Sequence, residues 1–347
     1  MIRRIFSYAL HSRLENVAAI AVSSSLLVLF LTTRLFRSFS LGMHDLLFIL
    51  LPVGVLAVKI LLGLLSSSKE DPAGDVGPIQ FLALTFRPFA KLFRDWFPFL
   101  LLSACYFSLY SNLILRVNPH TADAFLSRID ASLAGGQPAL LLEPFIHPWL
   151  TDSLNLIYFS FVLYLPGQAL YFYVAKDGPA FRRLMMGYLT LILMGVTSYL
   201  LVPAVGPERY LAESFTHDLQ GQTLSIGVDY IMRNAHVAHD CFPSLHVGIP
   251  LLLAFYLRDH ARRAFIPALV YVILMCGATI YLRYHYLIDV IAAFAYAPAA
   301  YYLNDFLLAR WPGERAVFLT RPIRKAPAEE ESFGAIPTFS QSAGVEK

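Results

Sequence analysis

Charged residues are scarce in this sequence. Asp, Glu, Lys and Arg make up 15% of its 347 residues, against about 25% in an average soluble protein. Apolar residues make up 57%, and the mean hydropathy is +0.58. This balance excludes an ordinary soluble domain and indicates an integral membrane protein. The net charge is only +3, so the composition gives no support for nucleic-acid binding.

Cysteine is also rare. The three cysteines, Cys105, Cys241 and Cys276, are odd in number and far apart, which argues against a disulfide framework. Cys241 closes the segment 236–241, H-V-A-H-D-C, but the spacing of this segment fits no zinc-binding pattern well. We therefore expect no metal and no cofactor.

Long apolar runs are abundant. A helix needs about 20 residues to cross the hydrocarbon core of a bilayer. Eight runs of roughly this kind lie at 17–35, 46–65, 98–115, 154–175, 185–202, 243–257, 264–281 and 286–308. The runs are continuous rather than alternating, which favours helices over strands. We predict an all-α polytopic membrane protein with about eight transmembrane helices.

Basic residues gather at the segments that would lie inside if the N-terminus is cytoplasmic. The opposite orientation would place nearly all of these clusters outside, against the positive-inside rule. Arg34 and Arg37 are the main exceptions. The inner clusters are Arg3, Arg4 and Arg13; Lys69, Arg87, Lys91 and Arg94; Lys176, Arg182 and Arg183; Arg258, Arg262 and Arg263; and Arg310, Arg315, Arg321, Arg324 and Lys325. We expect both termini in the cytoplasm.

The pattern divides the chain into three parts. Residues 1–97 are expected to hold two membrane helices and a basic amphipathic segment, which lies along the inner surface or forms an ordinary loop. Residues 98–310 hold the other six spans, and the external segment 116–149 between two of them caps a site or dips into the interface. Residues 311–347 lack apolar periodicity and are expected to form a largely disordered cytoplasmic tail.

Two polar stretches interrupt the apolar pattern at helix ends. They read C-F-P-S-L-H over 241–246 and R-Y-H-Y-L-I-D over 283–289. The predicted topology places both on the outer side, together with Arg209 in the external loop. Asp289 follows His285 by four residues, so both lie on one helical face.

These residue types suit phosphoryl transfer. A neutral histidine, His285, can attack phosphorus while Asp289 accepts a hydrogen bond from its other nitrogen. His246 can protonate the departing oxygen as a general acid. Arg209, Ser244, Arg283 and backbone amides at a helix N-terminus can bind the phosphate oxygens. The alternative interpretation is that these residues have only structural roles, as interfacial residues, helix caps and headgroup-facing anchors.

The two stretches resemble the second and third signature motifs of the type-2 phosphatidic acid phosphatase superfamily, P-S-G-H and S-R-x-x-x-x-x-H-x-x-x-D. More narrowly, C-F-P-S-L-H-V and H-Y-L-I-D-V resemble the inositol phosphorylceramide synthase and sphingomyelin synthase branch. The resemblance spans about 98–308 and implies a six-helix core. It also implies that His285 is the nucleophile, Asp289 its orienting partner and His246 the general acid, with Ser244 contacting phosphate.

The sequence departs from the family pattern in its basic residues. The first motif, K-x-x-x-x-x-x-R-P, is absent, and G-P-E-R-Y with Arg209 occupies the corresponding loop. Ala278 and Thr279 stand where the third motif has Ser-Arg, which leaves Arg283 as a substitute. The phosphate-binding shell is thus predicted to be Arg209, Ser244 and Arg283.

The resemblance implies a lipid phosphatase or phosphotransferase that works through a phosphohistidine, without metal, on the non-cytoplasmic side. The expected partners are a lipid phosphate or phosphodiester, the bilayer, and water or an alcohol as acceptor. We expect a bacterial inner membrane with the site in the periplasm. The alternative is a non-catalytic transporter or lipid-binding membrane protein with the same fold.

Overall fold

The structure is a computed structural model that describes residues 94–97, 114, 117–175, 178–219, 221 and 239–311. The predicted spans 17–35 and 46–65 lie outside the described residues, as does all of 98–115 except Ile114. The amphipathic inner segment, apart from 94–97, and the tail from 312 also lie outside them. The predicted division into three parts therefore stays a prediction.

The described residues form helices and no strand, and the only extended pairing among them is an isolated bridge between Ala204 and Asp240. This confirms the all-α prediction for this part of the chain. The long helices are α8 (Pro148–Val174), α9 (Gly178–Leu201), α12 (Leu245–His260), α13 (Arg262–Tyr281) and α14 (Leu287–Arg310). They cover the five C-terminal apolar runs. α8 and α9 begin six and seven residues before the predicted runs, and the other helix ends agree to within three residues.

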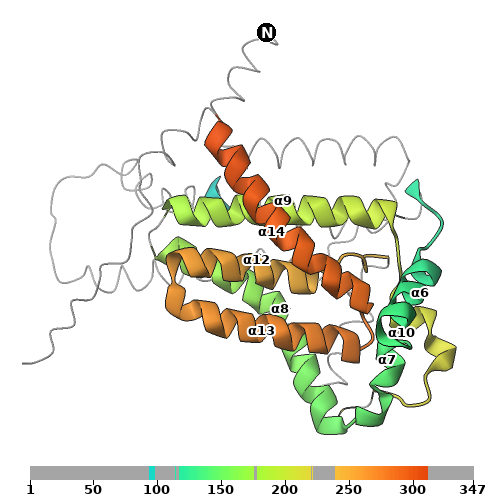
Figure 1. Cartoon of the computed structure of the whole chain (residues 1–347). Helices are drawn as coiled ribbons and strands as arrows, with labels where there is room; N and C mark the ends of the chain where they lie inside the picture. The colour runs from blue at the N-terminus through green and yellow to red at the C-terminus, as the bar shows by residue number, and fades with distance from the viewer. Residues whose placement is uncertain are drawn as a thin grey trace, which may run out of the picture.

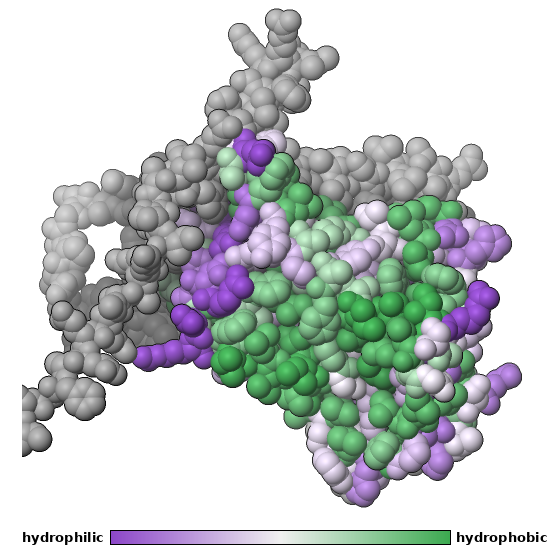
Figure 2. All heavy atoms as spheres, viewed as in Figure 1, coloured by the Kyte–Doolittle hydropathy of each residue, from purple (hydrophilic) through white to green (hydrophobic). Residues whose placement is uncertain are grey.

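Four of these helices, α8, α9, α13 and α14, are long and apolar enough to cross a membrane. They indicate an integral membrane protein. The predicted count of eight spans includes segments outside the described residues. Apolar side chains cover much of the face shown in Figure 2, with polar residues at both ends of the bundle. Exposed residues of this kind include Ile266, Val270 and Ile273 of α13 and Phe294 of α14, as expected for helices that face lipid.

α12 is shorter than its neighbours, with 16 residues, and occupies the middle of the bundle. It packs against α8, α9, α13 and α14 (Figure 1). From Val247 to Ala254 every one of its residues is buried. A helix that is apolar on all sides is expected at such a central position, and its N-terminus carries the C-F-P-S-L-H stretch.

Short elements gather at one end of the bundle (Figure 1). They are α6 (Asp123–Ala134), α7 (Pro138–Leu141), η3 (Glu143–Phe145), α10 (Pro207–Tyr210) and η4 (Ala212–Ser214). α6 ends at Gly135, whose φ of 72° lies in the left-handed region that suits glycine at a helix end. These elements lie beside the α13–α14 junction, which carries the second polar stretch.

An ion cluster ties the helices together at the opposite end. Arg183 of α9 donates to Asp259 of α12 at 2.8 Å and, through two nitrogens, to Asp305 of α14 at 2.7 Å each. Its guanidinium also donates to the hydroxyl of Tyr301 at 2.7 Å. A planar guanidinium can serve several acceptors at once, so one residue joins three helices.

Candidate active site

The turn between α13 and α14 places His285 beside the start of α14. The amide of Arg283 donates to the carbonyl of Ile280 at 3.0 Å, and that of Tyr284 donates to Thr279 at 3.1 Å. These are the two bonds of a Schellman motif. Arg283 holds the position that is usually glycine, with φ at 67°. The chain therefore reverses sharply, and Asp289 falls in the first turn of the next helix.

Asp289 holds His285 by one ring nitrogen. Nδ1 of His285 lies 3.4 Å from Oδ2 of Asp289, and the same oxygen accepts the amide N–H of Tyr286 at 2.8 Å. The side chains are deeply buried, with His285 4% exposed and Asp289 0%. A carboxylate only accepts, so this pairing assigns the proton to Nδ1 and leaves a lone pair on Nε2.

His246 faces that free nitrogen. It is the second residue of α12, and its Nδ1 lies 3.3 Å from Nε2 of His285. Its ring stacks on Tyr158 of α8 at 4.5 Å between centroids and lies 4.7 Å from Phe161. The structure thus aligns Asp289, His285 and His246 from two separate polar stretches.

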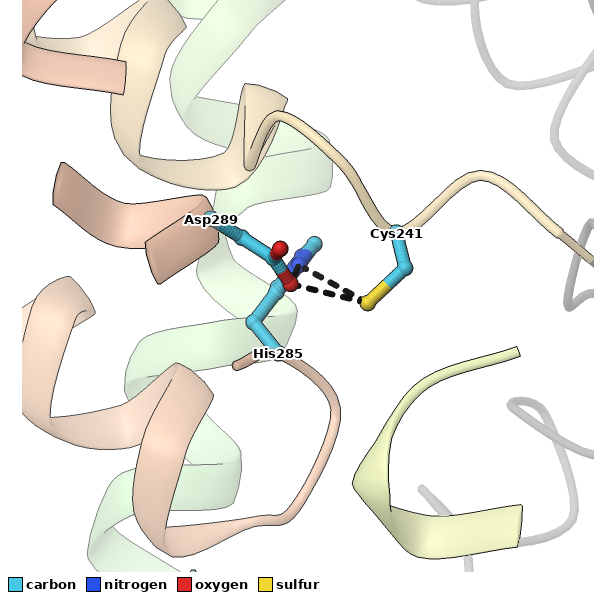
Figure 3. Close-up of side chains that lie close together, drawn as sticks. All are labelled: Cys241, His285 and Asp289. Atoms are coloured by element: carbon cyan, nitrogen blue, oxygen red, sulfur yellow. Dashed lines mark hydrogen bonds and ion pairs between the residues drawn. The ribbon is translucent and has the colours of Figure 1, made fainter. Parts of the chain in front are cut away.

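Cys241 also belongs to this group, although it was not predicted to be a site residue. Its thiol donates to Oδ2 of Asp289 at 2.9 Å and lies 3.6 Å from Nδ1 of His285. The three side chains point toward one another in Figure 3. Burial and the negative charge of Asp289 raise the pKa of Cys241 well above its usual value, so the thiol stays protonated and acts as a donor.

Cys241, His285 and Asp289 can each offer one ligand atom to a metal, and these atoms all lie within 4.8 Å of one another. Sulfur, imidazole and carboxylate ligands suit zinc. Their proximity is already accounted for by the bonds that they make with each other through Oδ2 of Asp289. We derive no step through a metal.

Ser244 links the starts of α12 and α14. Its amide donates to the backbone carbonyl of Asp289 at 3.1 Å. Its Oγ is buried and has no hydrogen-bond partner among the described residues, and it makes no capping bond to α12. Buried hydroxyls are normally bonded, so this oxygen is free to bind another molecule.

The G-P-E-R-Y segment lies against the same turn. Gly206 has φ at 86°, and a Cβ there would come within 2.7 Å of the carbonyl oxygen of Tyr284. Only glycine allows this close approach. The amide of Glu208 donates to the carbonyl of Arg283 at 2.7 Å. Arg209 comes next, with its side chain exposed.

Arg283 is bonded to η3 and to the segment 215–217. Its Nη2 donates to Oε1 of Glu143 at 3.1 Å and to the carbonyl of His217 at 2.7 Å, and its guanidinium lies 3.7 Å from the ring centroid of Phe215. Burial lowers the pKa of Arg283, which the charge of Glu143 partly offsets. Its Nε is buried without a partner among the described residues. A phosphate-binding role for Arg283 therefore stays a prediction.

Sequence reasoning also missed two carboxylates on α6. Asp123 and Asp130 are buried. Asp123 accepts a hydrogen bond from the backbone of Gly206, and Asp130 accepts two from the backbone of the stretch 283–289. Their seven-residue spacing places them on one face of a helix. That spacing was the available signal.

Residues 124–303 match the family model of the PAP2 superfamily. The chain belongs to this superfamily. Its members are generally phosphatases, so membership points to phosphatase or phosphotransferase activity. The matched range contains both polar stretches and most of α6. No curated protein and no solved structure matches the chain, so the synthase-like branch stays a prediction.

Proposed function

We propose that this PAP2 protein is a membrane lipid phosphatase or phosphotransferase that works through a phosphohistidine at His285. The observation that carries the proposal is the alignment of Asp289, His285 and His246 through successive contacts of 3.4 and 3.3 Å. The first contact orients the nucleophile, and the second places a proton donor in front of its reactive nitrogen, on the side of the ring away from Asp289.

In the first step, the lone pair of His285 Nε2 forms a bond to phosphorus, and the bond from phosphorus to the lipid oxygen breaks. The departing oxygen takes a proton from His246. Asp289 stabilises the imidazolium that develops on His285. In the second step, water or an alcohol gives its proton to His246, its oxygen bonds to phosphorus, and the N–P bond breaks.

The free enzyme has to open before the first step. Phosphorus and the leaving oxygen lie between the two histidines during reaction, and 3.3 Å between their nitrogens leaves no room for both atoms. His285 is buried and bonded to Asp289, whereas His246 is only half-buried. The ring of His246 lies against the rings of Tyr158 and Phe161, and its Nδ1 lies 3.5 Å from the Tyr158 hydroxyl. We therefore assign the movement to the ring of His246.

Four candidate donors could bind the phosphate oxygens. The Ser244 hydroxyl is buried and unbonded among the described residues, and the first amides of α12 lack partners within the helix. Arg209 lies on α10, the first turn after the Gly206 loop that touches the catalytic turn. Arg283 can contribute its unpartnered Nε. Such donors stabilise charge that develops in the transition state.

The substrate is proposed to be a lipid phosphate or phosphodiester, delivered along the apolar surface of the bundle. Water as acceptor gives a phosphatase, and an alcohol gives a transferase of the synthase-like kind that the motifs resemble. The site is proposed to face the periplasm of a bacterial inner membrane, since the basic helix ends lie at the other end of the bundle.

The first test incubates purified protein with phosphatidic acid, a prenyl diphosphate or phosphatidylinositol, each labelled in its phosphate. Free phosphate without a new lipid identifies the phosphatase. A new phosphate-bearing lipid, formed only when an alcohol lipid is added, identifies the transferase. Wild-type protein inactive on all of them would favour the transporter or lipid-binding alternative.

The second test replaces the two histidines separately. We expect His285→Ala to abolish turnover and the acid-labile phosphoryl label on the enzyme. His246→Ala should slow turnover by about 10²–10⁴-fold, as for loss of a general acid. Rapid-quench labelling and steady-state rates measure both effects. Wild-type activity in either folded variant would refute the mechanism.

A further inference from the structure

The helix α6 buries both of its acidic side chains and exposes two of its large apolar ones. Asp123, Leu126, Ser127 and Asp130 form its buried face, whereas Phe125 and Leu133 are 56% and 53% exposed. A buried carboxylate is costly unless it is well bonded. The inward position of both acids therefore needs a reason, and their partners supply it.

Asp130 caps the catalytic helix from outside. Its Oδ2 accepts the amide N–H of Leu287 at 2.7 Å, and its Oδ1 accepts that of Ile288 at 2.9 Å. These are the first two amides of α14, which have no partner within the helix. A carboxylate at a helix N-terminus is also favoured by the helix dipole. The first turn of α14 is thus fixed by a residue 157 positions away in sequence.

Asp123 holds the other side of the same turn. Its Oδ1 accepts the hydroxyl of Tyr286 at 2.9 Å, the residue after His285. The amide N–H of Val205 is shared between its two oxygens, at 3.1 Å each, and Oδ1 also accepts the amide N–H of Gly206 at 3.0 Å. One carboxylate therefore fixes the Gly206 loop to the turn that carries His285.

The two carboxylates bracket the nucleophile without touching it. Between them they bind Tyr286, Leu287 and Ile288, which separate His285 from Asp289. We propose that Asp123 and Asp130 are positioning residues that set the geometry of the His285–Asp289 pair through this turn. The positioning role rests on the proposed function. It gives these two acids of α6 a part in ordering the site, although neither of them touches the substrate.

The activity test compares Asp130→Ala and Asp130→Asn with Ser132→Ala, an exposed substitution on the same helix. We expect kcat to fall roughly ten- to a hundredfold in Asp130→Ala, because the turn loses both bonds, with KM close to that of wild type. Asp130→Asn keeps one acceptor oxygen and should fall between Asp130→Ala and wild type. Ser132→Ala should match wild type. Thermal unfolding of each purified variant shows that it is folded.

A double-mutant cycle separates positioning from general stability. If Asp130 acts through Asp289, adding Asp130→Ala to Asp289→Asn should reduce kcat much less than it does in wild type. A purely structural role would give the same factor in both backgrounds, and that result would overturn the proposal. Asp123→Ala, tested in the same cycle, should behave like Asp130→Ala.

Hydrogen exchange tests the bonds from the Leu287 and Ile288 amides to Asp130 independently of activity. We call this pair of bonds the clamp. In peptides covering 284–292, Asp130→Ala should speed exchange at Leu287 and Ile288, and Ser132→Ala should not. Unchanged exchange would overturn the clamp, and with it the positioning role, but not the proposed catalytic function. Wild-type protein inactive on every lipid phosphate would overturn the proposed function together with the positioning role, while faster exchange in Asp130→Ala would still identify the clamp as a structural contact.

Discussion

One carboxylate oxygen, Oδ2 of Asp289, accepts from three different donors. Oδ2 of Asp289 receives the Tyr286 amide at 2.8 Å, the Cys241 thiol at 2.9 Å and Nδ1 of His285 at 3.4 Å. Oδ1 is buried without a partner among the described residues. The thiol and the amide hold the carboxylate in place, so the longer contact to His285 depends on both.

We predict that Cys241 contributes as a hydrogen-bond donor and not as a nucleophile. Cys241→Ala removes the donor and should lower kcat/KM about tenfold, because a hydrogen bond to a charged group contributes about 1.5–3 kcal/mol. Cys241→Ser keeps a donor and should retain most of the activity. Steady-state kinetics measure the difference.

Cys276→Ala, a half-buried position in the C-terminal half of α13, is the matched control and should leave the rate unchanged. Equal losses in Cys241→Ser and Cys241→Ala would show that sulfur itself, or its volume, matters rather than the donated hydrogen.

Because the pKa of Cys241 is raised by burial, the native thiol should also react slowly with maleimides at neutral pH.

At the scale of elements, Glu143 of η3 joins the segment at Thr216 to the turn that carries His285. Its Oε1 accepts from Arg283 at 3.1 Å and from the amide of Thr216 at 3.0 Å, and its Oε2 accepts the Thr216 hydroxyl at 2.8 Å. The left-handed Arg283 backbone is costly for a residue with a side chain, and these bonds help to maintain it.

This link should depend on pH. Burial opposes ionisation of Glu143, but hydrogen bonds from Thr216 and His217 and the charge of Arg283 outweigh it and lower the pKa of Glu143. A lowered carboxyl pKa stabilises the fold above the ordinary glutamate pKa, and the contribution is lost as pH falls through the lowered value. We expect the unfolding temperature of wild type to fall toward that of Glu143→Gln in this acidic window.

The control is Glu213→Gln, which changes an exposed carboxylate on the neighbouring η4. Glu213→Gln should follow wild type at every pH. Thermal scans across the acidic range compare the three proteins, and a constant gap between wild type and Glu143→Gln would contradict the assignment.

The whole molecule has two chemically different ends. The site and its short elements lie at one end of the bundle, and the ion cluster of Arg183 lies at the other with the basic helix ends at Arg258, Arg262 and Arg310. The positive-inside rule predicts that the basic end is cytoplasmic.

This orientation can be tested with introduced cysteines. In a background with Cys105 and Cys276 replaced by alanine, Glu213→Cys should react with a membrane-impermeant maleimide in intact right-side-out vesicles. Arg262→Cys should react only after the vesicles are opened. Both positions are exposed, and labelling is read by gel shift. The reverse pattern would place the site in the cytoplasm.

Local sequence determined the long helices and the pairing of His285 with Asp289. Continuous apolar runs have to pair their backbone groups internally in a membrane, which favours helices, and α13 and α14 begin and end within two residues of the predicted runs. The four-residue spacing of His285 and Asp289 places them on one face whatever the rest of the chain does. Backbone geometry alone sets such short-range relations.

Tertiary structure decided which distant residues meet. The approach of His246 to His285, the thiol of Cys241 on Asp289, the link from Arg283 to Glu143 and the carboxylates of α6 all join residues 39 to 163 positions apart. No periodicity encodes such contacts, because they arise from how the helices pack and where the turns between them lead. The sequence therefore determined which groups were available, and the packing determined which of them share a site.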